Sequence, residues 1–389
     1  MSFTLLGLGT STPERNIAQA DAAALAATFN NAAPGRERTL AAIYRQTRIE
    51  RRGSVLLEAP AQEAFAQSFY PPAGDDGAAG PTTATRMERY RQAAGSLACA
   101  AAARALEAGA VSPAEVTHLV TCSCTGFANP GVDLDAVARL GLPATVQRTH
   151  VGFMGCHGAF NALRVADAFA TADPRAVVLV ICVELCSLHF QYGPRADHVV
   201  ANSIFADGAG AAVGVGAGHA RGPETGRWRI VGQASSILPD SADQMGWLIG
   251  DHGFEMSLSA QVPATIAEHI APFVAAGIAA HGLVPADVRS WAVHPGGPRV
   301  LASVAEALAL DSGALDVSHH VLTWHGNMSS ATILFILERL IARGAASPCV
   351  ALAFGPGLTA ELAVFSGPHL EPRPAASPET AAARHGGPA

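Results

Sequence analysis

Three short segments of the sequence carry side chains that could do covalent or acid–base chemistry. Residues 152–159 (GFMGCHGA) hold Cys156, residues 291–298 (WAVHPGGP) hold His294, and residues 324–330 (WHGNMSS) hold Asn327. A cysteine can carry an acyl group as a thioester. Imidazole and carboxamide groups can donate hydrogen bonds to an oxygen on which negative charge develops. Together, the three side chains indicate acyl transfer through a thioester.

Cys156 stands where a predicted strand turns into a helix. Small residues around it allow a sharp turn. The helix N-terminus offers free N–H groups and a positive partial charge, which favour a thiolate. We therefore expect a nucleophilic thiol with an oxyanion site beside it, the alternative being a buried, inert thiol. The neighbouring His157 is excluded as its base, because adjacent residues on a helix do not face each other.

His294 ends an apolar segment that predicts a buried strand, and α/β sheets bind ligands at the carboxyl ends of their strands. Asn327 or Ser329 could instead cap the helix that follows, and His294 could be bonded to the next turn. Cys, His and Asn with no third acid expected nearby form a site for decarboxylative Claisen condensation. His294 and Asn327 would stabilise the enolate left when a malonyl thioester loses CO₂, whereas an aspartate at position 327 would repel it.

Alternating apolar strands and Ala-rich helices with Gly-rich joints predict an α/β layered fold. Strands are expected at residues 3–8, 118–124, 145–151, 176–183, 209–215, 227–236, 290–293, 350–354 and 358–365. Helices are expected at residues 18–31, 38–46, 85–108, 132–140, 159–171, 259–280, 298–308 and 329–342. The alternation of strands and helices occurs in both parts of the chain, which predicts two similar halves. Residues 1–220 would contain the cysteine, and residues 221–366 would contain the histidine and the asparagine. Residues 367–389 are Pro- and Ala-rich and are expected to be disordered.

Composition excludes several classes of protein. Of the 389 residues, 49% are hydrophobic and 15% are charged, which excludes global disorder. The formal charge of −7 gives no reason to expect a nucleic acid or an anionic membrane as partner. All 25 basic residues are arginine, so a catalytic lysine is excluded. The N-terminus does not resemble a signal peptide and no run of 18 apolar residues occurs, which predicts a cytoplasmic protein.

The seven cysteines predict neither a disulfide framework nor a metal site. Their number is odd in a chain without export signals. Cys122 and Cys124 are separated by one residue, and no second pair stands at zinc-finger spacing. Most of these thiols are expected to be small core side chains.

The three motifs, in this order, resemble the type III polyketide synthases, the chalcone and stilbene synthase superfamily. The resemblance runs from about residue 5 to residue 365. It includes residues 354–358 (FGPGL), similar to the family's cyclisation loop, and residues 204–209 (IFADGA), in which Phe205 matches the gatekeeper phenylalanine. It implies a thiolase-like αβαβα fold, homodimers, CoA thioester substrates without a carrier protein, and no metal or redox cofactor.

The resemblance also implies contacts with the substrates. The implied cavity residues are Cys124, Thr125, Asn129, Cys186, His189, Phe205, Gly253, Ser329, Phe354, Gly355, Pro356 and Gly357, and the implied CoA contacts are Arg45, Arg48, Gly296 and Gly297. Phe205 would separate the CoA tunnel from the cavity, and Asn129 falls where the partner subunit inserts a side chain. Basic residues of the plant enzymes are replaced by Thr39, Ala42 and Gln46, so arginines at 36, 38, 45 or 48 would take over phosphate binding.

Residues 184–187 (ELCS) resemble bacterial members that make alkylpyrones or alkylresorcinols from fatty acyl-CoA. Asn129 argues against a very long starter. Glu184, on a buried strand, needs a hydrogen-bond partner to stay charged and is expected to be structural.

We therefore expect an iterative type III polyketide synthase. It would load a starter acyl-CoA onto Cys156, extend it with malonyl-CoA, and release a pyrone or a phenolic or resorcinol-type ring.

One alternative is an enzyme like β-ketoacyl-ACP synthase III, which makes a single condensation on an acyl carrier protein. The acidic, lysine-free composition argues against an acidic carrier as partner. A second is a non-catalytic acyl-CoA-binding protein of the same fold. A papain-like hydrolase also uses Cys, His and Asn, but its cysteine stands in a different motif near the N-terminus.

Overall fold

Nine strands form one continuous mixed sheet across the computed structural model, which describes residues 3–30, 32–58, 67–73, 80–222 and 226–367. Their order is β11-β12-β13-β8-β1-β7-β6-β4-β5. The strands are β1 (Phe3–Ser11), β4 (His118–Ser123), β5 (Gln147–Gly152), β6 (Val177–Leu185), β7 (Asp207–Gly216), β8 (Arg229–Ile237), β11 (Ser290–Val293), β12 (Cys349–Gly355) and β13 (Thr359–Ser366).

The two halves of this sheet have the same order of antiparallel and parallel strand pairs. From the centre outward, the first half reads β1-β7-β6-β4-β5 and the second reads β8-β13-β12-β11. Each begins with antiparallel pairs and ends with parallel ones, β6-β4-β5 in the first half and β12-β11 in the second. β1 and β8 join the halves through two residue pairs, Phe3 with Ile230 and Thr4 with Arg229. The boundary predicted at residue 220 falls in the connection between β7 and β8.

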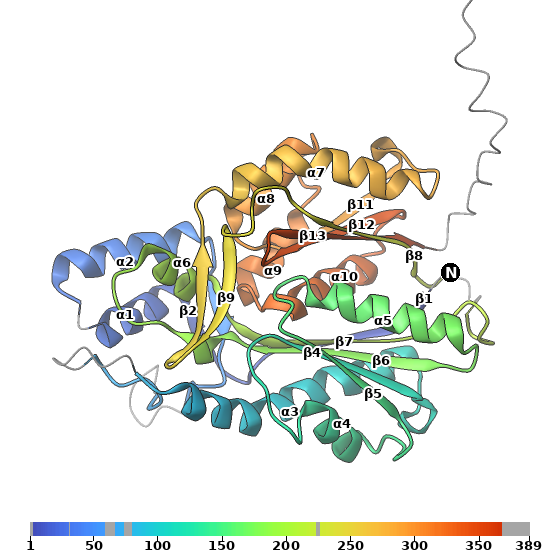
Figure 1. Cartoon of the computed structure of the whole chain (residues 1–389), viewed down its shortest axis with the longest axis horizontal. Helices are drawn as coiled ribbons and strands as arrows, with labels where there is room; N and C mark the ends of the chain where they lie inside the picture. The colour runs from blue at the N-terminus through green and yellow to red at the C-terminus, as the bar shows by residue number, and fades with distance from the viewer. Residues whose placement is uncertain (1–2, 31, 59–66, 74–79, 223–225, 368–389) are drawn as a thin grey trace, which may run out of the picture.

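Helices cover both faces of the sheet and fill the space between its two halves (Figure 1). α3 and α4 lie below the first half, α5 and α10 lie between the halves, and α7 and α8 lie above the second half, which gives five layers and confirms the predicted αβαβα arrangement. The helices are α1 (Gln19–Phe29), α2 (Pro34–Gln46), α3 (Thr83–Gly109), α4 (Val132–Leu140), α5 (Gly158–Ala172), α6 (Ala196–Ile204), α7 (Val262–Ala279), α8 (Pro298–Ala307), α9 (Asp316–His325) and α10 (Thr332–Ala342). Four short 3₁₀ helices are η1 (Pro113–Glu115), η2 (Cys186–His189), η3 (Pro285–Asp287) and η4 (Ser329–Ala331).

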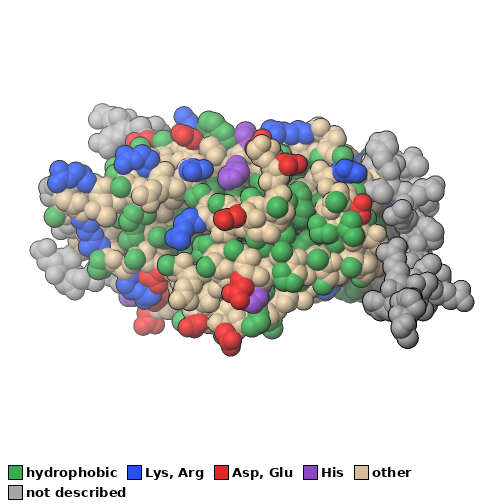
Figure 2. Space-filling view, turned by 90° about the horizontal axis from the view of Figure 1, so that it is seen from above, with side chains coloured by type: hydrophobic (Ala, Val, Ile, Leu, Met, Phe, Trp, Pro, Cys, Tyr) green, Lys and Arg blue, Asp and Glu red, His purple; other side chains and the backbone are tan. Residues whose placement is uncertain are grey.

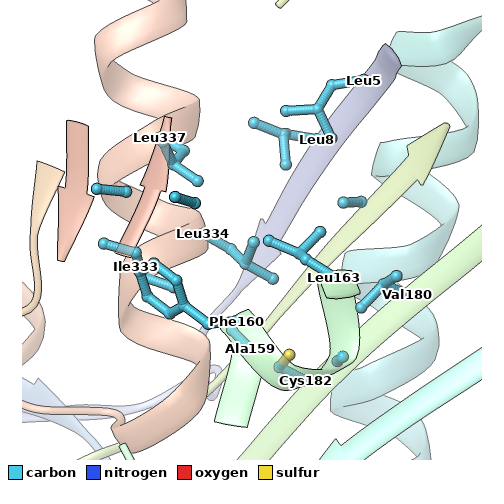
Figure 3. Packing of buried hydrophobic residues seen from close by; sticks show 14 of the residues in the cluster. Leu5, Leu8, Ala159, Phe160, Leu163, Val180, Cys182, Ile333, Leu334 and Leu337 are labelled. Atoms are coloured by element: carbon cyan, nitrogen blue, oxygen red, sulfur yellow. The ribbon is translucent and has the colours of Figure 1, made fainter. Parts of the chain in front are cut away.

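The core consists of three main apolar seams, one at each junction of helices with the sheet. β6 shows why, because its side chains alternate between two of the seams. Val178, Val180 and Cys182 pack into the central seam, whereas the residues between them pack against α3. Figure 3 shows the central seam, where Phe160 and Leu163 of α5 meet Leu334 of α10. This seam fixes the two inner helices relative to each other.

The sequence missed the elements that lie outside the main sheet. These are the two-stranded antiparallel sheet of β2 (Asn16–Ala18) and β3 (Arg51–Gly53), the hairpin of β9 (Met245–Gly250) and β10 (Gly253–Leu258), and the helices α6 and α9. The strands β2 and β3 have three residues each, too few to show an alternation of apolar and polar side chains. The helix expected at residues 329–342 begins with the 3₁₀ turn η4. The predicted disorder of residues 367–389 lies outside the described residues, apart from Gly367.

α7 is long and apolar enough to cross a membrane by length and composition, with a mean hydropathy of 1.4 over 18 residues. Its residues Val262, Ile266, Ile270, Val274 and Ile278 recur at helical spacing and pack into the outer seam of the second half. A core helix of a soluble protein passes the same test. The face of the molecule above α7 and α8 carries many hydrophobic side chains between scattered charged ones (Figure 2).

Truncating a side chain in the central seam should destabilise the whole fold. We expect Leu334→Ala, at a fully buried position, to lower the free energy of unfolding by about 2–5 kcal/mol, because it leaves a cavity between α10 and the sheet. Leu248→Ala, at a position with 69% exposure, is the control and should change it by less than about 0.5 kcal/mol. Urea unfolding followed by circular dichroism measures both values, and equal losses would contradict this account of the core.

Candidate active site

Cys156 lies in the turn between β5 and α5, two residues before the first residue of the helix, Gly158. The turn requires glycine at position 155, where φ is +81° and a Cβ atom would lie 2.5 Å from Cδ of Pro356. The close approach joins the cysteine turn of the first half to the FGPG segment of the second. Cys156 itself is 8% exposed.

Asn327 follows α9 and is fixed through its main chain. Its N–H donates to the carbonyl of Ile204 at 3.0 Å, and its carbonyl accepts from the N–H of Ala206 at 2.9 Å. The side-chain Oδ1 accepts from the N–H of Ser329 at 2.8 Å, which turns Nδ2 toward Sγ of Cys156, 3.9 Å away. The amide therefore faces the thiol, as the sequence predicted for a group aimed into the cavity.

His294 directly follows β11, and its N–H donates to the carbonyl of Leu352 at 2.8 Å. The side chain is 1% exposed. Among the residues that the structure describes, neither ring nitrogen has a hydrogen-bond partner. A buried imidazole without partners is costly unless a ligand satisfies it. Both nitrogens are therefore available to a bound molecule.

One cavity of about 430 Å³ brings the three residues together. Cys156, His294 and Asn327 line it together with Phe205. Its volume lies in the usual range for small-molecule sites. The three motifs, separated by up to 171 residues in the sequence, thus meet at one place.

The electrostatics of the site differ from the expectation of a resting thiolate. Burial raises the pKa of the Cys156 thiol to about 11, opposed by a hydrogen bond from Ser329 and increased by the charge of Glu184. Burial, with a smaller contribution from His157, lowers the pKa of His294 to about 3. The structure contains no hydrogen bond between His294 and Cys156. The thiol and the imidazole are therefore both neutral in this state, since desolvation outweighs the helix terminus.

A neutral imidazole suits the other predicted role of His294. With a pKa far below neutral it carries one N–H donor and no charge at physiological pH. It can therefore donate to an oxygen that becomes negative, as Nδ2 of Asn327 can. The pair forms an oxyanion site without a titrating group.

Glu184 lies beneath this cavity and is fully buried at the end of β6. Its carboxylate accepts hydrogen bonds from Oγ of Ser330, from Oγ1 of Thr125 at 2.7 Å and from the N–H of Cys124 at 3.0 Å. Burial nevertheless raises its pKa. These donors supply the partners that the sequence analysis required, and they tie β6 to the loop after β4 and to η4. A carboxylate thus lies nearer to Cys156 than the sequence analysis expected.

Two further cavities extend the site inward. A small one beside Cys156 shares Cys156 and Phe205 with the main cavity. A second, apolar one of about 110 Å³ shares Cys186, Phe205 and Trp247 with the small one. Phe205 thus lies at the junction of all three. The arrangement provides an apolar space on the far side of Phe205 from His294.

The structure places most of the implied substrate residues on these cavity walls. The lining residues are Phe205, Phe354, Cys124, Thr125, Cys186, Ser329, Pro356, His189, Gly296 and Gly297. His189 is held at both nitrogens, by the carbonyl of Thr125 at 2.7 Å and the N–H of Phe254 at 3.0 Å. His189 therefore forms part of the cavity wall and has no free nitrogen that could bind a substrate.

Other implied residues lie outside the walls. Gly355 packs against His157, and Gly253 packs against Arg86. Gly357 has a φ of +109° and shapes the loop. Asn129 is exposed and lines none of the described cavities. Their implied substrate contacts stay predictions.

The implied CoA arginines are also displaced from the cavity. Arg45 and Arg48 are exposed and do not line it, whereas Arg299 does, next to Gly297. Sequence reasoning missed Arg299, although it directly follows the HPGGP motif. It also missed Trp247, whose Nε1–H donates to the carbonyl of Cys124 at 2.7 Å and which lines both inner cavities. The sequence of β9 shows no alternation signal, because Leu248, between Trp247 and Ile249, is also apolar.

Within the described residues, no group of three or more His, Cys, Asp or Glu side chains could hold a metal ion. All seven cysteines are free and buried.

Comparisons with known proteins agree over nearly the whole chain. Residues 2–219 match the N-terminal domain of chalcone and stilbene synthases, and residues 229–367 match the C-terminal domain. The alpha-pyrone synthesis polyketide synthase-like Pks18 of Mycobacterium tuberculosis is 33% identical over 365 residues, 92% of this chain and 90% of its own. The 1,3,6,8-tetrahydroxynaphthalene synthase of Streptomyces peucetius is 38% identical over 269 residues, 67% of this chain and 70% of its own.

Solved structures show the same fold. PKS-I from the brown alga Ectocarpus siliculosus superimposes with a TM-score of 0.86 at 30% identity, covering 94% of this chain and 99% of that one. The fungal type III polyketide synthase ORAS superimposes with a TM-score of 0.80 at 25% identity and the same coverage. The described fold is therefore thiolase-like, as the motifs implied.

Alkylation of Cys156 should report its raised pKa. With a pKa of about 11, roughly one thiol in ten thousand is ionised at pH 7. We expect the rate of iodoacetamide modification at Cys156 to rise about tenfold per pH unit between pH 7 and pH 10. Peptide mass spectrometry after timed labelling measures the rate at this one cysteine, and Cys156→Ser identifies background labelling. A rate that levels off below pH 8 would show instead a thiolate stabilised in the resting enzyme.

Proposed function

The chain belongs to the chalcone and stilbene synthase family, the type III polyketide synthases, and from this we propose that it condenses malonyl-CoA units onto a starter acyl group held by Cys156. The observation that carries the proposal is the meeting of the Cys156 thiol, the Asn327 amide and the unpartnered His294 ring in one cavity. No other described cavity contains all three groups.

The first step loads the starter. The sulfur of Cys156 attacks the thioester carbonyl of an acyl-CoA while its proton passes to a nitrogen of His294. The bond from the carbonyl carbon to the CoA sulfur breaks, and CoA leaves as a thiol with that proton. Because the resting thiol and imidazole are both neutral, the proton moves only as the new bond forms.

The second step generates the nucleophile. A malonyl-CoA binds in the same cavity with its thioester oxygen against the N–H groups of His294 and Asn327. The bond to the terminal carboxylate breaks, CO₂ leaves, and the electron pair passes into an enolate whose oxygen these donors stabilise. Neither donor carries a negative charge that would oppose the enolate.

The third step makes the carbon–carbon bond. The enolate carbon attacks the acyl group on Cys156 and expels the sulfur, so that the lengthened chain is now a CoA thioester. Returning this chain to Cys156 permits another round. We propose that the final chain closes to a pyrone or to a phenolic or resorcinol-type ring, in line with the names of the two bacterial relatives.

The apolar cavity beyond Phe205 supports a starter with an alkyl chain. Its walls include Leu25, Phe29, Leu56 and Leu57, and it adjoins the small cavity next to Cys156. An acyl group on the sulfur can extend into it past Phe205. Its modest volume, about 110 Å³, favours a chain of intermediate length, in agreement with the inference from Asn129.

We also propose that the enzyme is a cytoplasmic homodimer. β5 forms one end of the nine-stranded sheet, so one side of its main chain is unpaired in a single chain. Phe127, which contacts His150 of β5, is 40% exposed, and Met154 is 38% exposed. Apolar side chains beside an open strand edge support an interface there, and Asn129 lies in the same loop as Phe127.

Substitutions of Asn327 should distinguish the effect of an added negative charge on decarboxylation from the effect of a lost hydrogen-bond donor. We expect Asn327→Asp to slow CO₂ release from malonyl-CoA by about 10²–10³-fold, because it removes a donor and adds a charge that repels the enolate. Asn327→Ala, which only removes the donor, should lose less. Cys156→Ala should release CO₂ but form no condensed product. Radiolabelled CO₂ and product mass spectrometry, with free CoA substrates and no carrier protein, measure these rates; wild-type protein that yields neither CO₂ nor product would refute the proposal.

Filling the apolar cavity should shorten the accepted starter. We expect Leu57→Trp to lower kcat/KM for octanoyl-CoA relative to acetyl-CoA by about tenfold, since the indole occupies space that the chain needs. Leu57→Ala is the matched control and should shift the preference toward longer chains. Initial rates with acyl-CoA from acetyl to palmitoyl give both ratios. Identical starter profiles in the three proteins would show that the chain lies elsewhere.

A further inference from the structure

A cavity of about 340 Å³ lies outside the active site, between the two-stranded β2–β3 sheet and the helices α9 and α10. It is lined by Thr12, Asn16, Arg51, Gly53, His320, Trp324, His325 and Arg339. It shares no lining residue with the cavity that holds Cys156. No carboxylate stands among these lining residues, although the whole chain carries a formal charge of −7. The condensation chemistry gives this cavity no role.

Two guanidinium groups in the cavity are oriented by neutral partners. Arg51 donates from Nη1 to Oδ1 of Asn16 at 3.1 Å, and Arg339 donates from Nη2 to Nε2 of His325 at 3.0 Å. Across the described residues, neither arginine forms an ion pair with a carboxylate. Each guanidinium has five N–H donors, so most of them remain free. Such groups match the paired oxygens of a phosphate or a carboxylate.

The two histidines add donors without adding charge. Because Nε2 of His325 accepts from Arg339, the ring is neutral and its proton lies on Nδ1. Burial, and then the charge of Arg339, lowers the pKa of His325 to about 4. Burial and the charges of Arg339 and Arg343 lower the pKa of His320. At neutral pH the positive charge of the cavity therefore comes from its two arginines.

Trp324 supplies a flat apolar surface beside these charges. It is 47% exposed, and the ring of His320 lies 6.4 Å from it, centroid to centroid. A large aromatic side chain left half in water at the rim of a cationic cavity can stack on a planar ring. Arginines for an anion and an indole for a ring thus stand in one concave site.

The cavity lies directly behind the loop that carries Asn327. Trp324 and His325 precede Asn327 by three and two residues. Arg52, between the lining residues Arg51 and Gly53, donates to the carbonyls of Asn202 and Phe205, at 2.7 Å each. An occupant would therefore contact both segments that position the active-site loop.

We propose that this cavity binds a small aromatic anion, a phosphate or carboxylate group carried on a planar ring. The anion lies against the guanidinium groups of Arg51 and Arg339, and the ring stacks on Trp324. Binding does not depend on the condensation reaction, so the test is separate from that of the proposed function.

Isothermal titration calorimetry of the full chain with four probes tests this. Phenyl phosphate and benzoate carry ring and anion, inorganic phosphate carries the anion alone, and phenol carries the ring alone. We expect at least one aromatic anion to bind more tightly than inorganic phosphate and phenol. The tighter of phenyl phosphate and benzoate identifies the anion as phosphate or carboxylate.

Three substitutions locate the binding. Arg339→Gln and Arg51→Gln should each weaken binding of the aromatic anion by about tenfold or more, since each removes a charged donor. Trp324→Leu should abolish the preference over inorganic phosphate. Arg175→Gln, at a guanidinium 89% exposed elsewhere on the surface, is the control and should bind like the wild type. Arg51 is exposed, so its variant keeps the test valid should Arg339→Gln fail to fold.

The proposal is overturned by any of three results. One is no binding of either aromatic anion. Another is binding of inorganic phosphate as tight as that of the tighter of phenyl phosphate and benzoate, which would mean an adventitious ion only. The third is aromatic-anion binding unchanged in Arg51→Gln and Arg339→Gln, which would place the probe at another site.

Discussion

The two main-chain hydrogen bonds of Asn327 with Ile204 and Ala206 hold the active site together. Residues 204–206 belong to the first half of the chain and Asn327 to the second. The bonds set the amide of one half near the thiol of the other, 3.9 Å from Nδ2 to Sγ, and Phe205 stands between the two bonded residues Ile204 and Ala206. The close approach of Gly155 to Pro356 is a second connection between the halves, next to the thiol in the chain. The site therefore exists only where the halves meet.

Burial determines the chemistry within that frame. It raises the pKa of the thiol, lowers that of His294 and leaves two neutral donors in the cavity that holds the sulfur. A permanent ion pair would favour the resting enzyme, whereas neutral groups gain most when charge develops on the substrate. Glu184 acts in the same direction on the thiol, because its charge raises the pKa of Cys156 further, while hydrogen bonds from Ser330, Thr125 and Cys124 satisfy its carboxylate.

Sequence reasoning predicted the central sheet and the reactive groups because their signals are local. Continuous apolar runs such as that of β6 identify strands buried on both faces, and the Gly-rich turns around Cys156 and after His294 identify strand ends. The pKa of Cys156 could not be predicted, because desolvation depends on residues that are distant in sequence. Trp247 and Arg299 were missed for a similar reason: nothing near them in the chain indicates that a hairpin and a helix terminus complete the wall. The exposed positions of Arg45 and Arg48 likewise depend on how α2 packs.

The β9–β10 hairpin stands apart from the nine-stranded sheet, yet Met245, Trp247 and Met256 form part of the cavity wall. Leu248 and Ile249 of the same hairpin are exposed to solvent. Evolution can therefore vary this hairpin without disturbing the strands that carry the sulfur or the imidazole. The products of such enzymes would then diversify through substitutions in this hairpin, while the residues that carry out the reaction stay unchanged.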